Sequence, residues 1–243
     1  DITGYELELT LLKKIDDLEN IEVNQHCFAI DLITQHHLGI DVKRNGGIEC
    51  YGAYVLDEKT NQINTVISRF TLMATGGIGQ VYQTTTNPSI ATGDGIAMAY
   101  RAKAKISDME FIQFHPTALY EPGKSPAFLI SEAVRGYGAY IRNHKQKRFV
   151  FEYDVRGELA SRDIVAKSID SEMKRSGEDF VYLDCRHLDI EDFKKHFPNI
   201  YEKCISIGID PSKDMIPVVP AAHYLCGGIN VDKDGRTSIS ELY

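Results

Sequence analysis

Four polar segments in the second half of the chain carry residue types that can hold and convert a small anion. Three contain glycine or proline and one follows Gly157: Gln113–Thr117 with His115, Ser131–Gly136 with Ser131 and Glu132, Ala221–Gly228 with His223, and Ser161–Asp163 with Arg162. An ionised carboxylate is bound best by charged or strongly polar donors. Two histidines, an arginine and a Ser-Glu pair are therefore the set that a pocket for a dicarboxylate requires.

Each segment taken alone also has a purely structural interpretation. Pro116 restricts His115 to extended backbone, and a lone histidine is more often structural than catalytic. Ser131 can cap a helix whose first turn holds Glu132. Arg162 is different, because a cation in the first turn of a helix opposes the helix dipole. That position is not explained by helix stability and favours a functional role. Arg135, beside Gly136, is interpreted as structural.

The charge balance limits the class of partner. The 243 residues carry a formal net charge of -8, which argues against nucleic acid or an anionic membrane as the main partner. An anionic substrate must then be captured by a few local cations. No apolar run is long enough for a membrane helix, and the start of the chain does not resemble a signal peptide. Five cysteines, an odd number without zinc spacing, predict reduced thiols, a cytoplasmic location and no metal site.

Glycine-rich loops mark a second kind of site. Ala74–Gly79 follows an apolar strand, Thr84–Pro88 comes next, and Ala91–Gly95 opens a helix predicted over 96–103. Glycines of this kind let backbone N–H groups approach a phosphate or a flat ring. For Asp94 two interpretations are equally open: a capping carboxylate in the first helical turn, or an acceptor for ligand hydroxyls. The G-x-G-x-x-G fingerprint is absent.

The hydrophobic pattern predicts two kinds of domain. Before Glu110 it indicates a helix, strands and a hairpin, at 4–18, 27–33, 48–56, 62–67 and 70–74, with a turn at Gly46–Gly47. Beyond it we expect helices at 130–138, 162–175 and 189–207, strands at 181–183 and 229–231, and a turn at 232–235. The predicted fold is an α/β nucleotide-binding domain of the glutathione-reductase kind, interrupted by an α+β capping domain. The predicted boundaries are 1–110 and 225–243 for the first and 111–224 for the second.

Four motifs resemble the succinate dehydrogenase/fumarate reductase flavoprotein family: Asp108–Tyr120, Leu129–Gly136, Glu158–Val165 and Pro220–Gly228. Two more, Ala74–Gly77 and Thr92–Gly95, resemble the FAD segments of that family. The resemblance covers essentially the whole chain in the family's order. The runs Phe114–Tyr120 and Ala221–Gly228 are most similar to the L-aspartate oxidase branch.

The resemblance implies a role for each matching residue. Arg162 would be the catalytic arginine that moves a proton at the second carbon of the substrate. His115, Ser131, Glu132 and His223 would bind the dicarboxylate, L-aspartate, although the family often has threonine at the position of Ser131. The cofactor is expected to be FAD, contacted by Thr75, Gly76, Gly77, Asn87, Gly93 and Asp94.

The implied reaction is oxidation of L-aspartate to iminoaspartate in NAD biosynthesis, with oxygen or fumarate as electron acceptor. A fumarate reductase or succinate dehydrogenase subunit is the alternative within the family, and a non-catalytic folded module is the alternative outside it. The family's first FAD motif and a further substrate-binding arginine have no counterpart in the sequence. We therefore expect an internal fragment of a longer polypeptide that is inactive alone and retains little FAD.

Overall fold

The computed structural model describes residues 3–42 and 47–243, and its contacts divide the chain into two compact units. Unit 1 comprises Asp1–Gly76, Gly93–Glu110 and Gly227–Tyr243. Unit 2 comprises Gly77–Thr92 and Phe111–Cys226. Both helices and strands occur in each unit, so the chain is of mixed α/β class.

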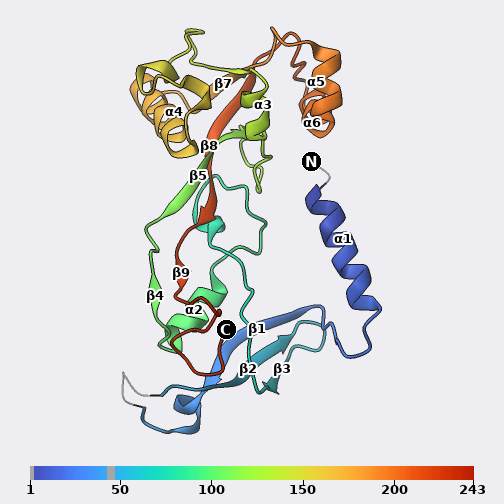
Figure 1. Ribbon diagram of the computed structural model, residues 1–243, viewed down its shortest axis with the longest axis vertical. Helices are drawn as coiled ribbons and strands as arrows, with labels where there is room; N and C mark the ends of the chain where they lie inside the picture. The colour runs from blue at the N-terminus through green and yellow to red at the C-terminus, as the bar shows by residue number, and fades with distance from the viewer. Residues whose placement is uncertain (1–2, 43–46) are drawn as a thin grey trace. The chain divides into compact units, whose positions relative to one another are not determined.

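Unit 1 is built on a three-stranded antiparallel sheet in the order β1-β2-β3 (Figure 1). Its elements are α1 (Thr3–Asp16), β1 (Cys27–Thr34), the 3-10 helix η1 (Gln35–Leu38), β2 (Cys50–Asp57), β3 (Gln62–Ile67), α2 (Asp94–Arg101), β4 (Ile106–Ser107) and β9 (Gly228–Ile229). The last two strands pair with each other. A small core forms where Met98 and Ala99 of α2 meet Leu32 of β1. The predicted first helix, first strand and hairpin are confirmed.

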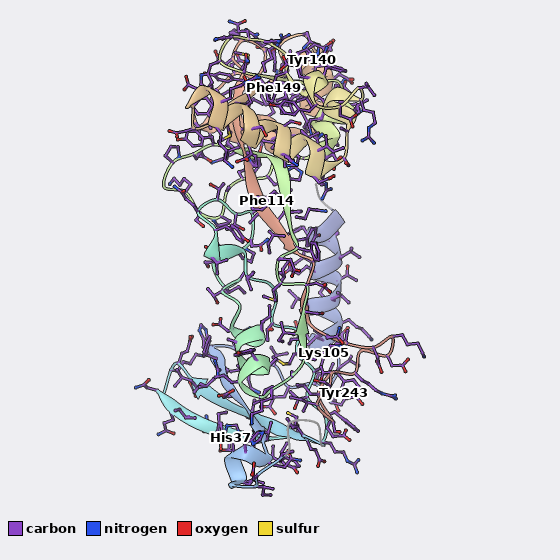
Figure 2. The ribbon with its side chains drawn as sticks, turned by 90° about the vertical axis from the view of Figure 1, so that its left-hand side faces the viewer. His37, Lys105, Phe114, Tyr140, Phe149 and Tyr243 are labelled. Carbon is purple, nitrogen blue, oxygen red and sulfur yellow. The ribbon has the colours of Figure 1, made fainter. Side chains whose placement is uncertain are left out.

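Two strands predicted in unit 1 differ from the structure: one does not form, and the other is shorter than predicted. Residues 70–74 were expected to form a strand, but Thr71 makes only an isolated bridge, to Leu242. The backbone hydrogen bonds there join 71–73 to 241–243 over too short a run for a ladder. The ring of Tyr243, which Figure 2 labels, packs edge-on against that of Phe70, with ring centroids 6.1 Å apart. Strand β9 is shorter than the predicted 229–231, whereas the turn at 232–235 is confirmed by a hydrogen bond from Gly235 N–H to Asp232 O. Gly46 lies outside the described residues.

Unit 2 contains a four-stranded antiparallel sheet in the order β5-β8-β7-β6. The strands are β5 (Ile112–Leu119), β6 (Tyr140–Arg142), β7 (Val181–Asp184) and β8 (Ile216–Leu225). The helices are η2 (Gly79–Val81), α3 (Glu132–Gly136), η3 (Val150–Glu152), η4 (Gly157–Leu159), α4 (Arg162–Ser176), α5 (Ile190–His196) and α6 (Pro198–Ser206). Helix α4 packs against β5, and Phe149 lies fully buried within the side chains of this unit (Figure 2).

Two predicted helices in unit 2 need correction, and three strands there were not predicted. The helix expected over 189–207 is two helices, because Pro198 cannot continue α5 and instead starts α6. Phe197 between them has non-helical backbone, with φ -131° and ψ 53°. Helix α3 is shorter than the predicted 130–138. The sheet also contains β5, β6 and β8, which the hydrophobic pattern did not predict, and β5 and β8 carry the candidate histidines.

Candidate active site

The pairing of β5 with β8 brings His115 and His223 together. His115 lies opposite Ala221 in the antiparallel register, two residues before His223, and the strands run side by side in Figure 1. The two imidazole rings meet edge to face, with centroids 5.5 Å apart and planes at 61°. Two residues separated by more than 100 positions in the sequence thus share one small site.

His115 is buried and neutral. Burial, followed by the charges of His223 and Arg162, lowers its pKa to about 3. The backbone N–H of Thr117 donates to its Nδ1 at 3.3 Å. Because a backbone N–H can only donate, Nδ1 must be the unprotonated nitrogen, and the ring proton lies on Nε2. His115 is therefore an uncharged N–H donor at neutral pH.

His223 is held from the segment before β5. Its Nδ1 lies 2.6 Å from Oγ1 of Thr86, and its backbone carbonyl accepts a hydrogen bond from Nδ2 of Asn87 at 2.8 Å. Burial and then the charge of Arg162 lower its pKa below the ordinary histidine value. Both histidines are thus shifted toward the neutral form.

Arg162, the first residue of α4, is fixed by two acceptors. Its Nε donates to Oε2 of Glu132 at 2.6 Å, and its Nη1 donates to Oε1 of Gln113 at 3.1 Å. The hydrogen bond from Arg162 holds the pKa of Glu132 below its usual range, so this carboxylate stays ionised. The ion pair offsets the unfavourable position of a cation at a helix N-terminus.

A second guanidinium lies behind this pair. Arg135 is almost fully buried, its Nη1 donates to the backbone carbonyl of Glu158, and its Nη2 lies 3.5 Å from Oε1 of Glu132. The carboxylate of Glu158 is itself paired with Arg148. The interpretation of Arg135 as structural therefore fits its burial, and its charge also adds to the positive potential at Glu132.

The serines that precede α3 and α4 behave differently. Ser131 caps α3, accepting from the N–H of Ala133 at 3.2 Å. Ser161 occupies the capping position of α4, but its hydroxyl makes no capping hydrogen bond. The proposed contact of Ser131 with substrate stays a prediction.

Of the residues predicted to contact FAD, four lie in unit 1, around the start of α2. Thr75 packs so tightly on the first turn of this helix that a Cβ on Gly95 would lie 1.7 Å from its Oγ1. Gly76, with φ +74°, has open space where a Cβ would be, and Gly93 precedes the helix with φ +84°. Asp94 lies in the first turn. An open glycine beside helical N–H groups suits the phosphate of a nucleotide, so these residues fit the predicted cofactor.

The other two predicted FAD contacts lie in unit 2. A Cβ on Gly77 would lie 3.9 Å from Oδ1 of Asn87, an ordinary contact distance. The amide nitrogen of Asn87 is engaged by the backbone of His223. Asn87 thus supports the histidine, and its contact with FAD stays a prediction.

A cavity of about 500 Å³ lies beside this site in unit 2, between α4 and strands β5 and β8. Apolar side chains dominate its lining, including Phe114, which Figure 2 labels on β5. Gln113, which also holds Arg162, contributes to its wall. The two histidines do not line it, so the cavity is distinct from the histidine pair.

Two residues of the site were not predicted as site residues, namely Gln113 and Thr86. Gln113 stands two positions before His115, the spacing that places side chains on one face of a strand. That signal was available only once β5 was known to be a strand. Thr86 belongs to the segment Thr84–Pro88, but nothing in the sequence connects it with His223.

In the part of the chain that the structure describes, no cluster of three or more metal-binding side chains occurs. No helix among residues 3–42 and 47–243 has the length and apolar character needed to cross a membrane. All five cysteines are free thiols.

Comparison with known proteins defines the class of this chain. A family model described as an FAD binding domain matches residues 1–243, and the chain belongs to that family. The match confirms the prediction of an FAD-binding fold and of FAD as the cofactor. A variant of E. coli quinol fumarate reductase has a similar structure, with a TM-score of 0.85 and 29% sequence identity, over 99% of this chain and 42% of that chain.

The more similar relatives are L-aspartate oxidases. The chain is 49% identical over 243 residues to L-aspartate oxidase of Yersinia pestis, covering 100% of this chain and 45% of the relative. It is 50% identical over 243 residues to L-aspartate oxidase 1 of Ralstonia nicotianae, covering 100% of this chain and 44% of the relative. The predicted resemblance to this branch is confirmed, and the chain spans less than half the length of these relatives.

Proposed function

We propose that the polypeptide to which this chain belongs oxidises L-aspartate to iminoaspartate with FAD as the oxidant, in the biosynthesis of NAD. The observation that carries the proposal is the meeting of His115 and His223 beside Arg162 in a chain of net charge -8. A dicarboxylate needs donors at both ends, and these residues are local donors in an otherwise acidic molecule. The identity of about one half to L-aspartate oxidases supports the choice of substrate.

In this proposal the two histidines bind the carboxylates as neutral N–H donors. Their lowered pKa values mean that no proton has to be lost or gained when the anion arrives near neutral pH. Ser131 and Glu132 line the same pocket. Orientation of the α-carbon by several fixed donors is the main contribution that the protein makes to such a reaction.

Oxidation of L-aspartate to iminoaspartate removes a hydride from the α-carbon and a proton from the amino group, and Arg162 is the proposed catalytic residue that moves this proton. Its guanidinium is held at two points, by Glu132 and Gln113, so its orientation is set before substrate binds. Bound FAD would accept the hydride that leaves the α-carbon. Thr75, Gly76, Gly77, Asn87, Gly93 and Asp94 are the residues of this chain proposed to hold the cofactor.

The finer organisation is part of the proposal. We assign 1–110 and 225–243 to a glutathione-reductase-like FAD domain and 111–224 to a capping domain that excludes water from the substrate. Oxygen or fumarate is the proposed electron acceptor. Free cysteines support a cytoplasmic location.

A succinate-oxidising or fumarate-reducing role is the alternative, favoured by the likeness to quinol fumarate reductase. Anaerobic flavin bleaching of the intact, FAD-loaded polypeptide distinguishes the two. We expect L-aspartate to bleach the flavin and succinate to leave it oxidised. Bleaching by succinate and not by L-aspartate would select the alternative, and bleaching by neither would remove both.

The 243-residue chain alone tests the non-catalytic interpretation. We expect it to purify with little flavin, because it spans less than half of the L-aspartate oxidases it resembles. Stoichiometric visible flavin absorbance in the purified chain would contradict this expectation.

A further inference from the structure

The threonine loop, residues 84–87, pairs with strand β8 directly beside His223. The N–H of Ala222 donates to the carbonyl of Thr84 at 3.0 Å, and the N–H of Thr86 donates back to the carbonyl of Ala222 at 3.1 Å. This backbone pairing places the side chain of Thr86 next to the imidazole that follows Ala222. The position of the hydroxyl is therefore set by main-chain hydrogen bonds within unit 2.

The hydroxyl of Thr86 meets one nitrogen of His223, the Nδ1, at an oxygen–nitrogen distance of 2.6 Å. A hydroxyl can donate or accept, whereas a neutral imidazole has one donor and one acceptor nitrogen. If Thr86 donates, the ring proton must lie on Nε2. If it accepts, Nε2 is a bare lone pair, which repels an anion.

The tautomer of His115 indicates which tautomer His223 needs. The backbone N–H of Thr117 donates to its Nδ1, and this leaves Nε2–H as the only donor of that ring. The rings of His115 and His223 face each other within one site. A dicarboxylate is bound by both rings only if His223 is in the same tautomer.

We propose that Thr86 is a positioning residue that donates to Nδ1 of His223 and so holds that imidazole as the Nε2–H tautomer. Both histidines then offer a neutral N–H donor to a carboxylate, one set by a backbone amide and the other by a side-chain hydroxyl. The proposal rests on the proposed dicarboxylate site. It adds that binding by His223 depends on a hydrogen bond from a loop distant in the sequence.

The unaltered protein supplies the first test. The intact, FAD-loaded polypeptide is labelled with 15N-histidine, and long-range proton–nitrogen spectra report which ring nitrogen of each histidine is protonated. The signals of His223 are assigned by their loss in His223→Gln. We expect the Nε2–H pattern at neutral pH, and an Nδ1–H or doubly protonated ring would overturn the proposal without any variant of Thr86.

Variants of Thr86 supply the second test. Thr86→Val removes the hydroxyl, and Thr86→Ala does the same without a new methyl group if the valine variant folds poorly. Loss of this donor should shift His223 toward Nδ1–H. It should also weaken fumarate binding to the oxidised protein, followed by flavin absorbance, roughly tenfold or more.

Two matched variants keep the test specific. Thr86→Ser retains a hydroxyl and should restore the tautomer and bring the fumarate Kd within about threefold of the unaltered value. Thr84→Val makes the same substitution in the same loop. Within the described residues Thr84 pairs with β8 through its backbone carbonyl and not its hydroxyl, so we expect no change.

An unchanged His223 tautomer and an unchanged Kd in the variants without a hydroxyl would contradict the proposal. Neither readout requires the flavin to be reduced by substrate. If L-aspartate fails to bleach the flavin while Thr86 still sets the tautomer, only the proposed reaction fails. If L-aspartate bleaches the flavin while the tautomer is independent of Thr86, only the present inference fails.

Discussion

The two units of this chain differ in how well they bury their own apolar side chains. Unit 2 has an extensive core in which Phe149 and Phe193 are fully buried. Unit 1 has a smaller core, and among its described residues every position of β3 is exposed. Leu72 is 77% exposed, and Leu7, Leu11 and Leu12 of α1 are exposed as well. Most of the large apolar side chains that are exposed among the described residues therefore belong to unit 1.

In the proposed function, the substrate residues and most of the cofactor contacts belong to different units. Glu132, Arg162 and His223, which we propose to act on the substrate, lie in unit 2 on elements fixed by its core. Most of the predicted cofactor contacts in this chain lie in unit 1. The L-aspartate oxidases that the chain resembles are more than twice as long as the chain. We infer that unit 2 shapes the part of the substrate site that these residues form, whereas the further arginine implied by the family resemblance and most of the cofactor site need more chain.

The largest expected effect is on catalysis from unit 2. Arg162→Gln in the intact polypeptide should slow flavin reduction by L-aspartate roughly 10⁴-fold, because it removes the proposed proton-transfer group. Its flavin content should be unchanged. Lys167→Gln, an exposed position on the same helix, is the control. Loss of bound FAD in Arg162→Gln would contradict the assignment of catalysis and cofactor binding to different units.

The next effect compares the two cores. Phe149→Ala should lower the free energy of unfolding of unit 2 by about 3–5 kcal/mol, because a fully buried ring leaves a cavity. Leu72→Ala should cost under about 0.5 kcal/mol in the 243-residue chain, where this side chain is exposed. Denaturant unfolding measures both. A larger cost for Leu72→Ala in the intact polypeptide would identify that surface as covered there.

A smaller effect is expected in unit 1. Gly95→Ala should destabilise α2 by about 1–3 kcal/mol, because the added Cβ would lie 1.7 Å from Oγ1 of Thr75. Alanine normally stabilises a helix relative to glycine, so a loss of stability would indicate the clash with Thr75 and a gain would contradict it. FAD affinity, followed by fluorescence, should fall with it. Gly136→Ala in α3 meets open space and should retain FAD.

The smallest effect, taken per pH unit, is the pH dependence of stability that His115 contributes. Its folded pKa of about 3 lies below the ordinary value of 6.5, so the unfolded chain binds a proton that the folded site rejects. Stability should therefore fall as the pH is lowered from about 6.5 toward 3, by at most about 1.4 kcal/mol per pH unit. His115→Gln should remove that slope, measured by unfolding at several pH values. His26→Gln, at an exposed position of unit 1, should leave the slope intact.

Local pattern was sufficient for the elements that do not depend on distant partners. Helix α1, the β2–β3 hairpin and helix α4 follow from the hydrophobic pattern alone. The pattern failed where proline interrupts a strand. Pro116 lies in β5, and Pro217 and Pro220 lie in β8. Proline cannot donate to a ladder, so these segments resemble loops when read alone.

The sequence by itself determined the residue types of the site and the family, because the motifs hold a distinctive set of polar residues beside glycine and proline. Only the tertiary structure decided that His115 and His223 face each other, and that Gln113 and Thr86 hold their neighbours. Strand register and the protonated nitrogen of an imidazole depend on partners far along the chain. No local pattern contains that information, since the partner of His223 lies 137 residues away.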